Sequence, residues 1–198
     1  ATAIHCGNKL SVLDFGGALG SLYFQHLAYF ERLPALEWSV IEQRHFVEAG
    51  RTHVQDETLR FYDSIESCLA EREPVISIVS SVLQYLPNPH QQLRQILAAT
   101  DKTIIDRLPL IDADTDRLTV QTVPASIYPA TYPAWFFSRR RFCELLESGN
   151  YRIAGEFESI DMCDLDGGLI NTVGIVVEKC DARGPITGRN SRAPTQHT

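Results

Sequence analysis

The sequence lacks the features that would place it in a membrane or outside the cell. No apolar run approaches the roughly 20 residues that a bilayer-spanning helix needs. The first ten residues, ATAIHCGNKL, contain no basic segment followed by an apolar core, so we expect no secretory signal there. The five cysteines are scattered and form no CxxC pair, which disfavours a structural zinc site and indicates reduced thiols. We therefore expect a cytoplasmic protein with no membrane partner and no metal.

Positive charge is also scarce. Lysine and arginine number 18 against 25 acidic residues, and the formal net charge is −7. Binding of nucleic acid phosphates calls for a basic surface, so this balance argues against a nucleic-acid partner. A small-molecule substrate is the favoured partner, and the sequence leaves the oligomeric state open.

The 198 residues are enough for one domain with a single well-buried core. We expect that domain over residues 1–180. Residues 181–198 are rich in Gly, Pro, Ser and Thr and contain almost no large apolar side chains. This composition predicts a disordered tail.

Strand-like and helix-like segments alternate along the domain. Apolar runs predict strands at 9–15, 35–42, 59–62, 74–83, 102–108, 151–160 and 169–179. Helical spacing predicts helices at 19–33, 44–53, 64–73, 89–100 and 139–148. The five alternations indicate an α/β fold with a doubly wound, Rossmann-like and mostly parallel sheet of seven strands. The last two strands are joined by only DMCDLDGG (161–168), so we expect them to form an antiparallel hairpin.

A glycine-rich loop, in VLDFGGALGS, follows the first strand. Its small residues are Gly16, Gly17, Ala18 and Gly20. In a doubly wound sheet this turn lies at the ligand-binding switch point, although a glycine cluster is also compatible with a simple tight turn. The dinucleotide pattern G-x-G-x-x-G fits poorly, because Ala18 and Ser21 stand at its second and third glycine positions. That mismatch disfavours a Rossmann-type oxidoreductase.

Two acidic residues narrow the choice of ligand. Asp14 lies two positions before the first glycine, where a carboxylate would repel a pyrophosphate and suit an ammonium group. Glu42 follows the second strand, where a carboxylate can accept both hydroxyls of a ribose. An amino-acid end joined to a ribose describes S-adenosylmethionine.

On these residues the chain resembles the class I S-adenosylmethionine-dependent methyltransferases. VLDFGGALG looks like their first motif, with Ala18 replacing a frequent glycine. SSVLQYLPNP (80–89) is similar to their fourth-strand motif, with Gln84 and Tyr85 at its usual histidine positions. The order of elements agrees over residues 9–180.

The resemblance implies a set of cofactor-binding residues. Asp14, Gly16, Gly17, Ala18 and Gly20 would hold the methionine end, Glu42 with Gln43 the ribose, Asp63 the adenine amino group, and Ser80 and Ser81 the floor. Asp63 is equally compatible with capping the helix that follows it. Ser80 and Ser81 are also compatible with being merely small residues at a strand end.

Residues 107–137 form a long insertion after the fifth strand, which we expect to be irregular. Its aromatic and proline residues predict a lid or wall over the substrate, or alternatively a hydrophobic cluster that seals the sheet edge. The expected substrate-binding residues are Gln84, Tyr85, Tyr128, Tyr132 and Trp135.

The segments IIDRLP, DRLTVQTVP and YPAWFFS resemble a poorly characterised bacterial family of methyltransferases whose genes lie near surface-polysaccharide genes. This resemblance implies methylation of a hydroxyl group on a saccharide or related metabolite. Asp106 is the candidate base, with Arg107 as its orienter or as a clamp for a substrate anion. A structural ion pair between Asp106 and Arg107 is the alternative. The rival reading of the whole chain is a non-catalytic cofactor-binding or interaction module.

Overall fold

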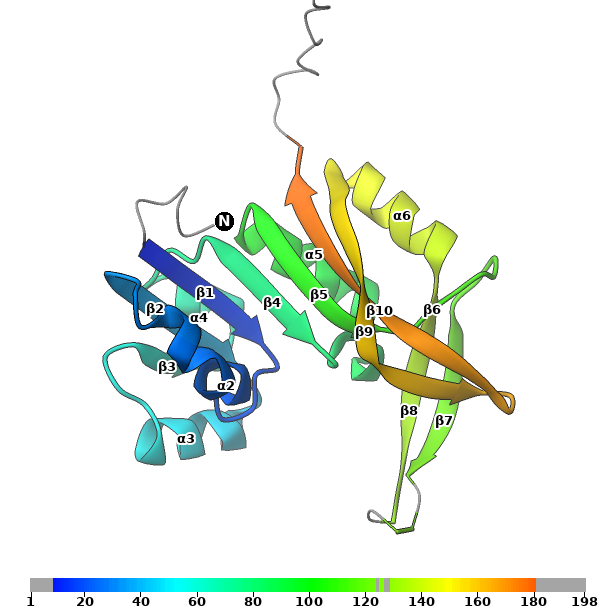
Figure 1. Cartoon of the computed structure of the whole chain (residues 1–198), viewed down its shortest axis with the longest axis horizontal. Helices are drawn as coiled ribbons and strands as arrows, with labels where there is room; N and C mark the ends of the chain where they lie inside the picture. Colours follow the sequence, from blue (N-terminus) through cyan, green and yellow to red (C-terminus); the bar gives the residue numbers. More distant parts are fainter. Residues whose placement is uncertain (1–8, 124, 127–128, 181–198) are drawn as a thin grey trace, which may run out of the picture.

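The computed structural model describes residues 9–123, 125–126 and 129–180. The tail expected at 181–198 lies outside these residues. A seven-stranded sheet with strand order β3-β2-β1-β4-β5-β10-β9 forms the centre of the molecule (Figure 1). The first five of its strands in sequence are parallel, and β10 runs antiparallel to both β5 and β9. The predicted fold class is confirmed.

The predicted elements are found with small changes at their ends. The sheet strands are β1 (Lys9–Phe15), β2 (Ala35–Ile41), β3 (Leu59–Tyr62), β4 (Ile76–Ser80), β5 (Lys102–Leu108), β9 (Tyr151–Leu165) and β10 (Gly168–Lys179). The helices are α2 (Ser21–Phe30), α3 (Arg44–His53), α4 (Ile65–Leu69), α5 (Pro89–Ala99), α6 (Arg139–Ser148) and the short 3₁₀ helix η1 (Leu83–Tyr85). Helix α4 is shorter than expected and ends at Leu69.

Helices cover both faces of the sheet and enclose two cores. On one face, Tyr23 of α2 and Val47 of α3 pack in a cluster with Trp38. On the other face, apolar side chains of α4, α5 and α6 pack in a larger cluster with Leu13. Successive residues of a strand point to opposite faces, which is why Val12 enters the first core and Leu13 the second.

The insertion at 107–137 is not irregular, contrary to expectation. It contains β6 (Leu110–Ile111), β7 (Arg117–Val123) and β8 (Ala130–Ser138), which form a second sheet in the order β6-β8-β7. The prolines obscured this pattern in the sequence. β6 pairs with β8 only at Phe137 and Ser138. At Pro133, β8 therefore has a partner strand on one side alone, that of β7, and a strand tolerates proline where its other edge is unpaired.

The connection between β9 and β10 is also shorter than expected. Both strands run into 161–168 and leave only Asp166 and Gly167 as the turn, with φ angles of 56° and 81°. Two positive φ angles in an Asp-Gly pair are typical of a type I′ hairpin turn. β10 pairs with β5 no further than Val173, so the hairpin continues beyond the sheet as a two-stranded ribbon (Figure 1).

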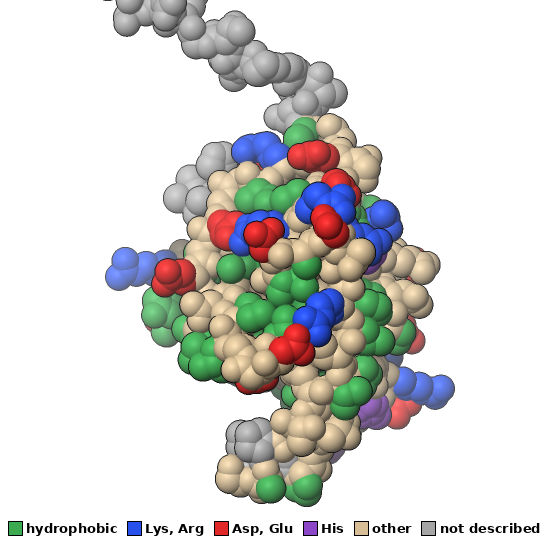
Figure 2. All heavy atoms as spheres, turned by 90° about the vertical axis from the view of Figure 1, so that its right-hand side faces the viewer, with side chains coloured by type: hydrophobic (Ala, Val, Ile, Leu, Met, Phe, Trp, Pro, Cys, Tyr) green, Lys and Arg blue, Asp and Glu red, His purple; other side chains and the backbone are tan. Residues whose placement is uncertain are grey.

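The ribbon and the β7–β8 hairpin carry exposed apolar side chains. Figure 2 shows hydrophobic side chains between charged ones on the side of the molecule where the β9–β10 ribbon ends. The exposed residues of the ribbon and the hairpin include Leu118, Val120, Ile160, Met162 and Leu169.

Among the described helices, none is long and apolar enough to cross a membrane.

Candidate functional site

The glycine loop after β1 is shaped largely by its own protein neighbours. Gly16, Ala18 and Gly20 all have positive φ angles, a backbone conformation that favours glycine. A Cβ atom on Gly16 would also lie 2.3 Å from a methyl carbon of Val82. The loop therefore needs glycine at position 16 for both its turn and its packing, whether or not a ligand approaches it.

Asp14 lies beneath this loop and is almost completely buried. Its Oδ2 accepts a hydrogen bond of 3.0 Å from the indole N–H of Trp38. Burial raises the pKa of Asp14 to about 6; the Trp38 hydrogen bond opposes this rise and the charge of Glu42 adds to it. A Cβ atom on Gly17 would lie 2.4 Å from the same carboxylate oxygen. The contact between Asp14 and a ligand ammonium group stays a prediction.

Beside the loop, a cleft of about 490 Å³ opens at the carboxyl ends of β1, β2 and β3, and we call it the first cleft. It brings together five of the predicted site residues, namely Gly16, Glu42, Gln43, Asp63 and Tyr85. Parallel strands present their carboxyl ends at one edge of a sheet, which is why residues far apart in sequence meet here. Phe15, Ile41, Ile65, Val82 and Leu86 provide apolar wall.

Three carboxylates line the first cleft, those of Glu42, Asp63 and Glu66, and local hydrogen bonds hold the first two. Glu42 Oε2 accepts the backbone N–H of Gln43 at 2.6 Å. Asp63 Oδ1 accepts the Ser67 hydroxyl at 3.1 Å. The alternative that Asp63 caps α4 is wrong, because Ser64 is the N-cap and its hydroxyl oxygen accepts the Ser67 N–H.

A second cleft of about 690 Å³ lies where the β7–β8 hairpin and the β9–β10 ribbon meet the ends of β4 and β5. It contains the predicted residues Ser81, Gln84, Tyr85, Arg107 and Tyr132. Tyr85 lines both clefts. Its ring meets that of Tyr132 edge-on, with centroids 5.3 Å apart.

The second cleft also has lining residues that the sequence did not reveal. Asp161, Asp164 and Thr172 come from the β9–β10 ribbon, and Thr119 and Gln121 come from β7. Alternation in RLTVQTV was the available signal for β7. Nothing in the sequence indicated that the ribbon folds toward the end of β5, because that depends on its twist beyond the sheet.

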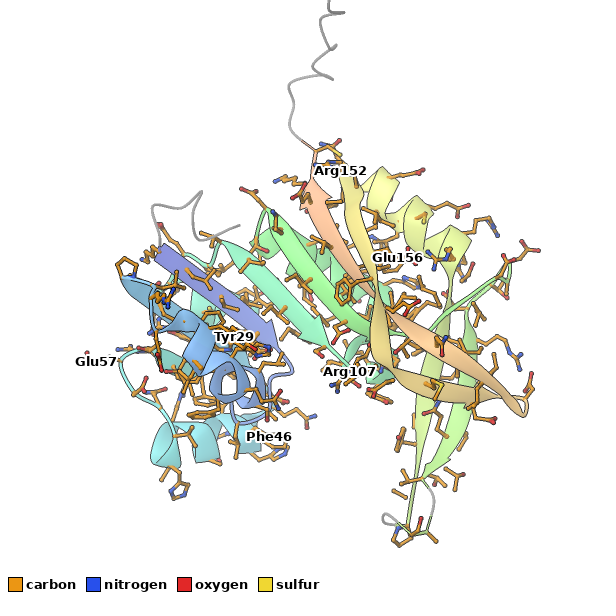
Figure 3. The ribbon with its side chains drawn as sticks, in the orientation of Figure 1. Tyr29, Phe46, Glu57, Arg107, Arg152 and Glu156 are labelled. Atoms are coloured by element: carbon orange, nitrogen blue, oxygen red, sulfur yellow. The ribbon has the colours of Figure 1, made fainter. Side chains whose placement is uncertain are left out.

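Asp106 and Arg107 come directly before Leu108, the last residue of β5. Figure 3 labels Arg107 near this end of the strand. Asp106 Oδ1 accepts the backbone N–H of Arg107 at 2.8 Å, and Oδ2 accepts the Ser80 hydroxyl at 3.3 Å. Arg107 Nε lies 3.7 Å from Asp106 Oδ2, so the alternative of an ion pair is found. The role of Asp106 as a base stays a prediction, and Asp106 is not in the lining of either cleft.

Trp135 occupies a different place from the one expected. Its indole N–H donates to the carbonyl oxygen of Leu86 at 3.2 Å, and its ring packs against the larger core. It lines a separate depression near His90 and lies outside both clefts. Trp135 thus joins the hairpin to the wall of the first cleft, which supports the alternative of a sealing cluster. Tyr128 lies outside the described residues.

Comparison with known proteins shows a similarity in fold. No protein-family model matches the chain, and no curated protein matches it. The glycopeptide N-methyltransferase MtfA, complexed with S-adenosylmethionine, matches 86% of this chain and 87% of its own with a TM-score of 0.61 and 11% identity. A SAM-dependent methyltransferase from Methanosarcina mazei matches 91% and 98% with a TM-score of 0.59 and 11% identity.

LepI in complex with SAM matches 86% of this chain at a TM-score of 0.56 and 11% identity. The chain spans only 43% of the LepI chain. These structures show that the chain has the Rossmann-like fold found in methyltransferases.

Proposed function

We propose that the chain binds S-adenosylmethionine in the first cleft and transfers its methyl group to a hydroxyl group of a small molecule, a saccharide or a related metabolite, in the second. The observation that carries this proposal is the pair of adjoining clefts that share Tyr85. The first holds the predicted cofactor residues Glu42 and Asp63. The second holds Arg107 and Tyr132.

The chemistry of the first cleft fits this cofactor. The Glu42 carboxylate follows β2 and would accept hydrogen bonds from the ribose hydroxyls. The Asp63 carboxylate would accept one from the adenine amino group, with Ile41 and Ile65 as apolar wall for the ring. A volume of about 490 Å³ lies within the range of small-molecule sites.

The carboxylates of the first cleft suit the charge of such a ligand. When bound, S-adenosylmethionine supplies a methyl group on a sulfonium cation. Glu42, Asp63 and Glu66 line the cleft, and the buried Asp14 lies near enough for the charge of Glu42 to raise its pKa. Negative charge around a cationic donor favours its binding over that of an anionic dinucleotide.

The chain's own contribution to transfer is position and exclusion of water. The side chains at the ends of β4 and β5 would hold the acceptor hydroxyl toward the first cleft, so that its oxygen attacks the methyl carbon in line with the breaking bond to sulfur. The electron pair of that bond stays on sulfur, and the hydroxyl proton passes to a carboxylate. Asp106 is the carboxylate predicted for this step.

Calorimetric titration of S-adenosylmethionine and S-adenosylhomocysteine into the full chain tests the proposal. We expect both to bind, and Glu42→Gln to weaken binding about tenfold or more, because a charged hydrogen-bond acceptor is lost. Glu48→Gln is the matched control, since Glu48 is an exposed carboxylate of α3 whose partner is Arg44. Absence of binding in a folded chain would overturn the proposal and favour the interaction module instead.

A further inference from the structure

Arg107 is held in an unusual backbone conformation at the edge of the second cleft. Its φ angle is 59°, which a side-chain-bearing residue adopts only at an energetic cost. The Asp106 carboxylate accepts its N–H, and the buried Gln84 lies with Nε2 3.5 Å from its carbonyl oxygen. Strain of this kind persists where surrounding contacts fix it, and here it places the Arg107 side chain in the cleft lining.

Asp161 of β9 lies next to Arg107 in the lining of the second cleft. Arg107 Nε lies 3.2 Å from Asp161 Oδ2, and the Asp161 backbone is fixed by the Thr172 hydroxyl, which donates to its carbonyl oxygen at 2.7 Å. The pair joins the end of the main sheet to the ribbon that walls the cleft. Their side chains are 35% and 46% exposed, so a ligand has access to both.

The hydrogen-bonding capacity of this pair is unused within the described part of the chain. Arg107 Nε is buried and donates no hydrogen bond, although the Asp161 oxygen is near. Among the described residues, no donor is hydrogen-bonded to the Asp161 carboxylate. A guanidinium has five N–H donors and a carboxylate accepts several hydrogen bonds, so the pair offers both donors and acceptors side by side.

The residues that line the second cleft carry more negative than positive charge. Arg107 is the cation among the lining residues, against the carboxylates of Asp161, Asp164 and Asp166. Arg117 pairs with Asp166 at 2.8 Å, which still leaves Asp164 uncompensated by an ion pair among the described residues. A phosphate or carboxylate ligand would meet net repulsion here, so Arg107 is poorly placed to act as a clamp for an anion.

The remaining lining suits a molecule with many hydroxyl groups. Ser81, Gln84, Gln121 and Thr122 are neutral groups that both donate and accept hydrogen bonds. The rings of Tyr85 and Tyr132 offer apolar faces with polar tips, against which the C–H face of a sugar ring can pack.

We propose that the Arg107–Asp161 pair binds two neighbouring hydroxyl groups of an uncharged polyhydroxylated ring, and so selects a neutral carbohydrate as the acceptor. Arg107 donates to one hydroxyl oxygen while the Asp161 carboxylate accepts the hydrogen of the next. The assignment rests on the proposed function, whose acceptor site it specifies.

The test measures binding to the S-adenosylhomocysteine-loaded chain by saturation-transfer NMR. The probes are the methyl glycosides of glucose, galactose and mannose, each beside its uronate and its 6-phosphate. We expect at least one neutral glycoside to bind, and its two anionic counterparts to bind about tenfold more weakly or less, as one charged hydrogen bond corresponds to about that factor. Tighter binding of the anionic forms, or no binding of any neutral glycoside, would overturn the assignment.

Three variants separate recognition from folding. Asp161→Asn removes the carboxylate nearest to Arg107 and leaves Asp106, 3.7 Å away, as its counter-charge. Neutral glycosides should then bind less well and anionic ones better, a reversal that a structural role would not cause. Arg107→Gln should weaken neutral binding without improving anionic binding. Glu158→Gln, an exposed carboxylate of β9 outside the cleft lining, should change neither.

Failure of the proposed function would look different. If the unliganded chain selects neutral glycosides but does not bind S-adenosylmethionine or S-adenosylhomocysteine, the methyltransferase proposal fails and the carbohydrate assignment stands. If the cofactor binds and the glycoside selectivity is absent, the carbohydrate assignment fails and the methyltransferase proposal stands.

Discussion

Asp14 and Trp38 are joined by a hydrogen bond from the indole N–H to a carboxylate that is only 1% exposed to solvent. The bond links the end of β1 to the middle of the neighbouring strand β2, beneath the glycine loop. It satisfies one oxygen of a buried acid whose pKa is nevertheless raised to about 6. The charged form of Asp14 is therefore disfavoured by the folded protein itself, which has consequences for stability.

Asp14→Asn should stabilise the protein at neutral pH. Between about pH 4 and 6 the folded state retains a proton that the unfolded chain releases near its ordinary pKa of 3.8, so the free energy of unfolding falls as pH rises through this window. Above pH 6 the full difference applies, about 3 kcal/mol for a shift of this size. The asparagine carbonyl can still accept the Trp38 hydrogen bond. Urea unfolding should show a gain at pH 7.5 and little change at pH 4.5, and an equal gain at both would contradict the argument.

The same substitution should weaken cofactor binding. If the Asp14 charge serves a ligand ammonium group, the variant that unfolds less readily at pH 7.5 will bind S-adenosylmethionine less tightly. Calorimetric titration of S-adenosylmethionine into the original chain and into Asp14→Asn measures the two affinities. Unchanged affinity would show that Asp14 supports the loop alone.

Gly17→Ala should destabilise the fold by about 1 to 3 kcal/mol through overpacking. The new methyl group would overlap the Asp14 carboxylate, which is short, buried and held by Trp38. Gly155→Ala is the control, because nothing lies within 4 Å of its Cβ position. In a chain that already carries Asp14→Ala, Gly17→Ala should lower the thermal unfolding temperature by less than it does in the original chain. An equal decrease in both would show that overlap with the Asp14 carboxylate is not the cause.

Tyr85→Ala should affect both clefts at once. We expect weaker cofactor binding and weaker glycoside binding, because Tyr85 lines both cavities and contacts Tyr132. Tyr85→Phe keeps the ring and should retain most of the affinity. Tyr29→Ala removes an exposed tyrosine of α2 outside both clefts and should leave both affinities unchanged. Loss of only one affinity in Tyr85→Ala would show that the clefts act separately.

Trp135→Phe should lower stability by about 1 kcal/mol, the value of one lost hydrogen bond. Because Leu86 lines the first cleft, we also expect weaker binding of S-adenosylhomocysteine. Binding of a neutral glycoside should not change, since Trp135 lies outside the second cleft. Loss of glycoside binding with unchanged stability would restore Trp135 as a substrate residue.

Much of the fold was accessible from the sequence because its first half obeys local rules. Apolar runs marked β1 to β5, and helical spacing marked the helices between them. The positions of Glu42 and Asp63 then followed from topology, since residues after parallel strands share one edge of the sheet. This is why four predicted cofactor residues line one cleft.

The second cleft could not be predicted in the same way. Prolines hid β8, and the Asp166–Gly167 turn signal was overlooked within a segment treated as a connection. Even a correct strand prediction would not have brought Asp161 to Arg107, which are 54 positions apart in sequence. Their contact depends on how far the ribbon extends and twists after leaving the sheet, and no local pattern encodes that.

The ribbon beyond Val173 also sets a rule for redesign. Side chains alternate between the two sides of β9 and β10, so the length of the ribbon can be changed only in steps of two residues per strand if Asp161 and its neighbours are to keep facing inward. Removing one such step from each strand beyond Asp161 and Thr172 would make the wall about 7 Å shorter while the remaining side chains keep their present sides. Removing a single residue beyond Asp161 would turn the side chains between that point and the Asp166–Gly167 turn to the opposite side of the ribbon. The depth of the second cleft is therefore adjustable in discrete increments, independently of the first cleft.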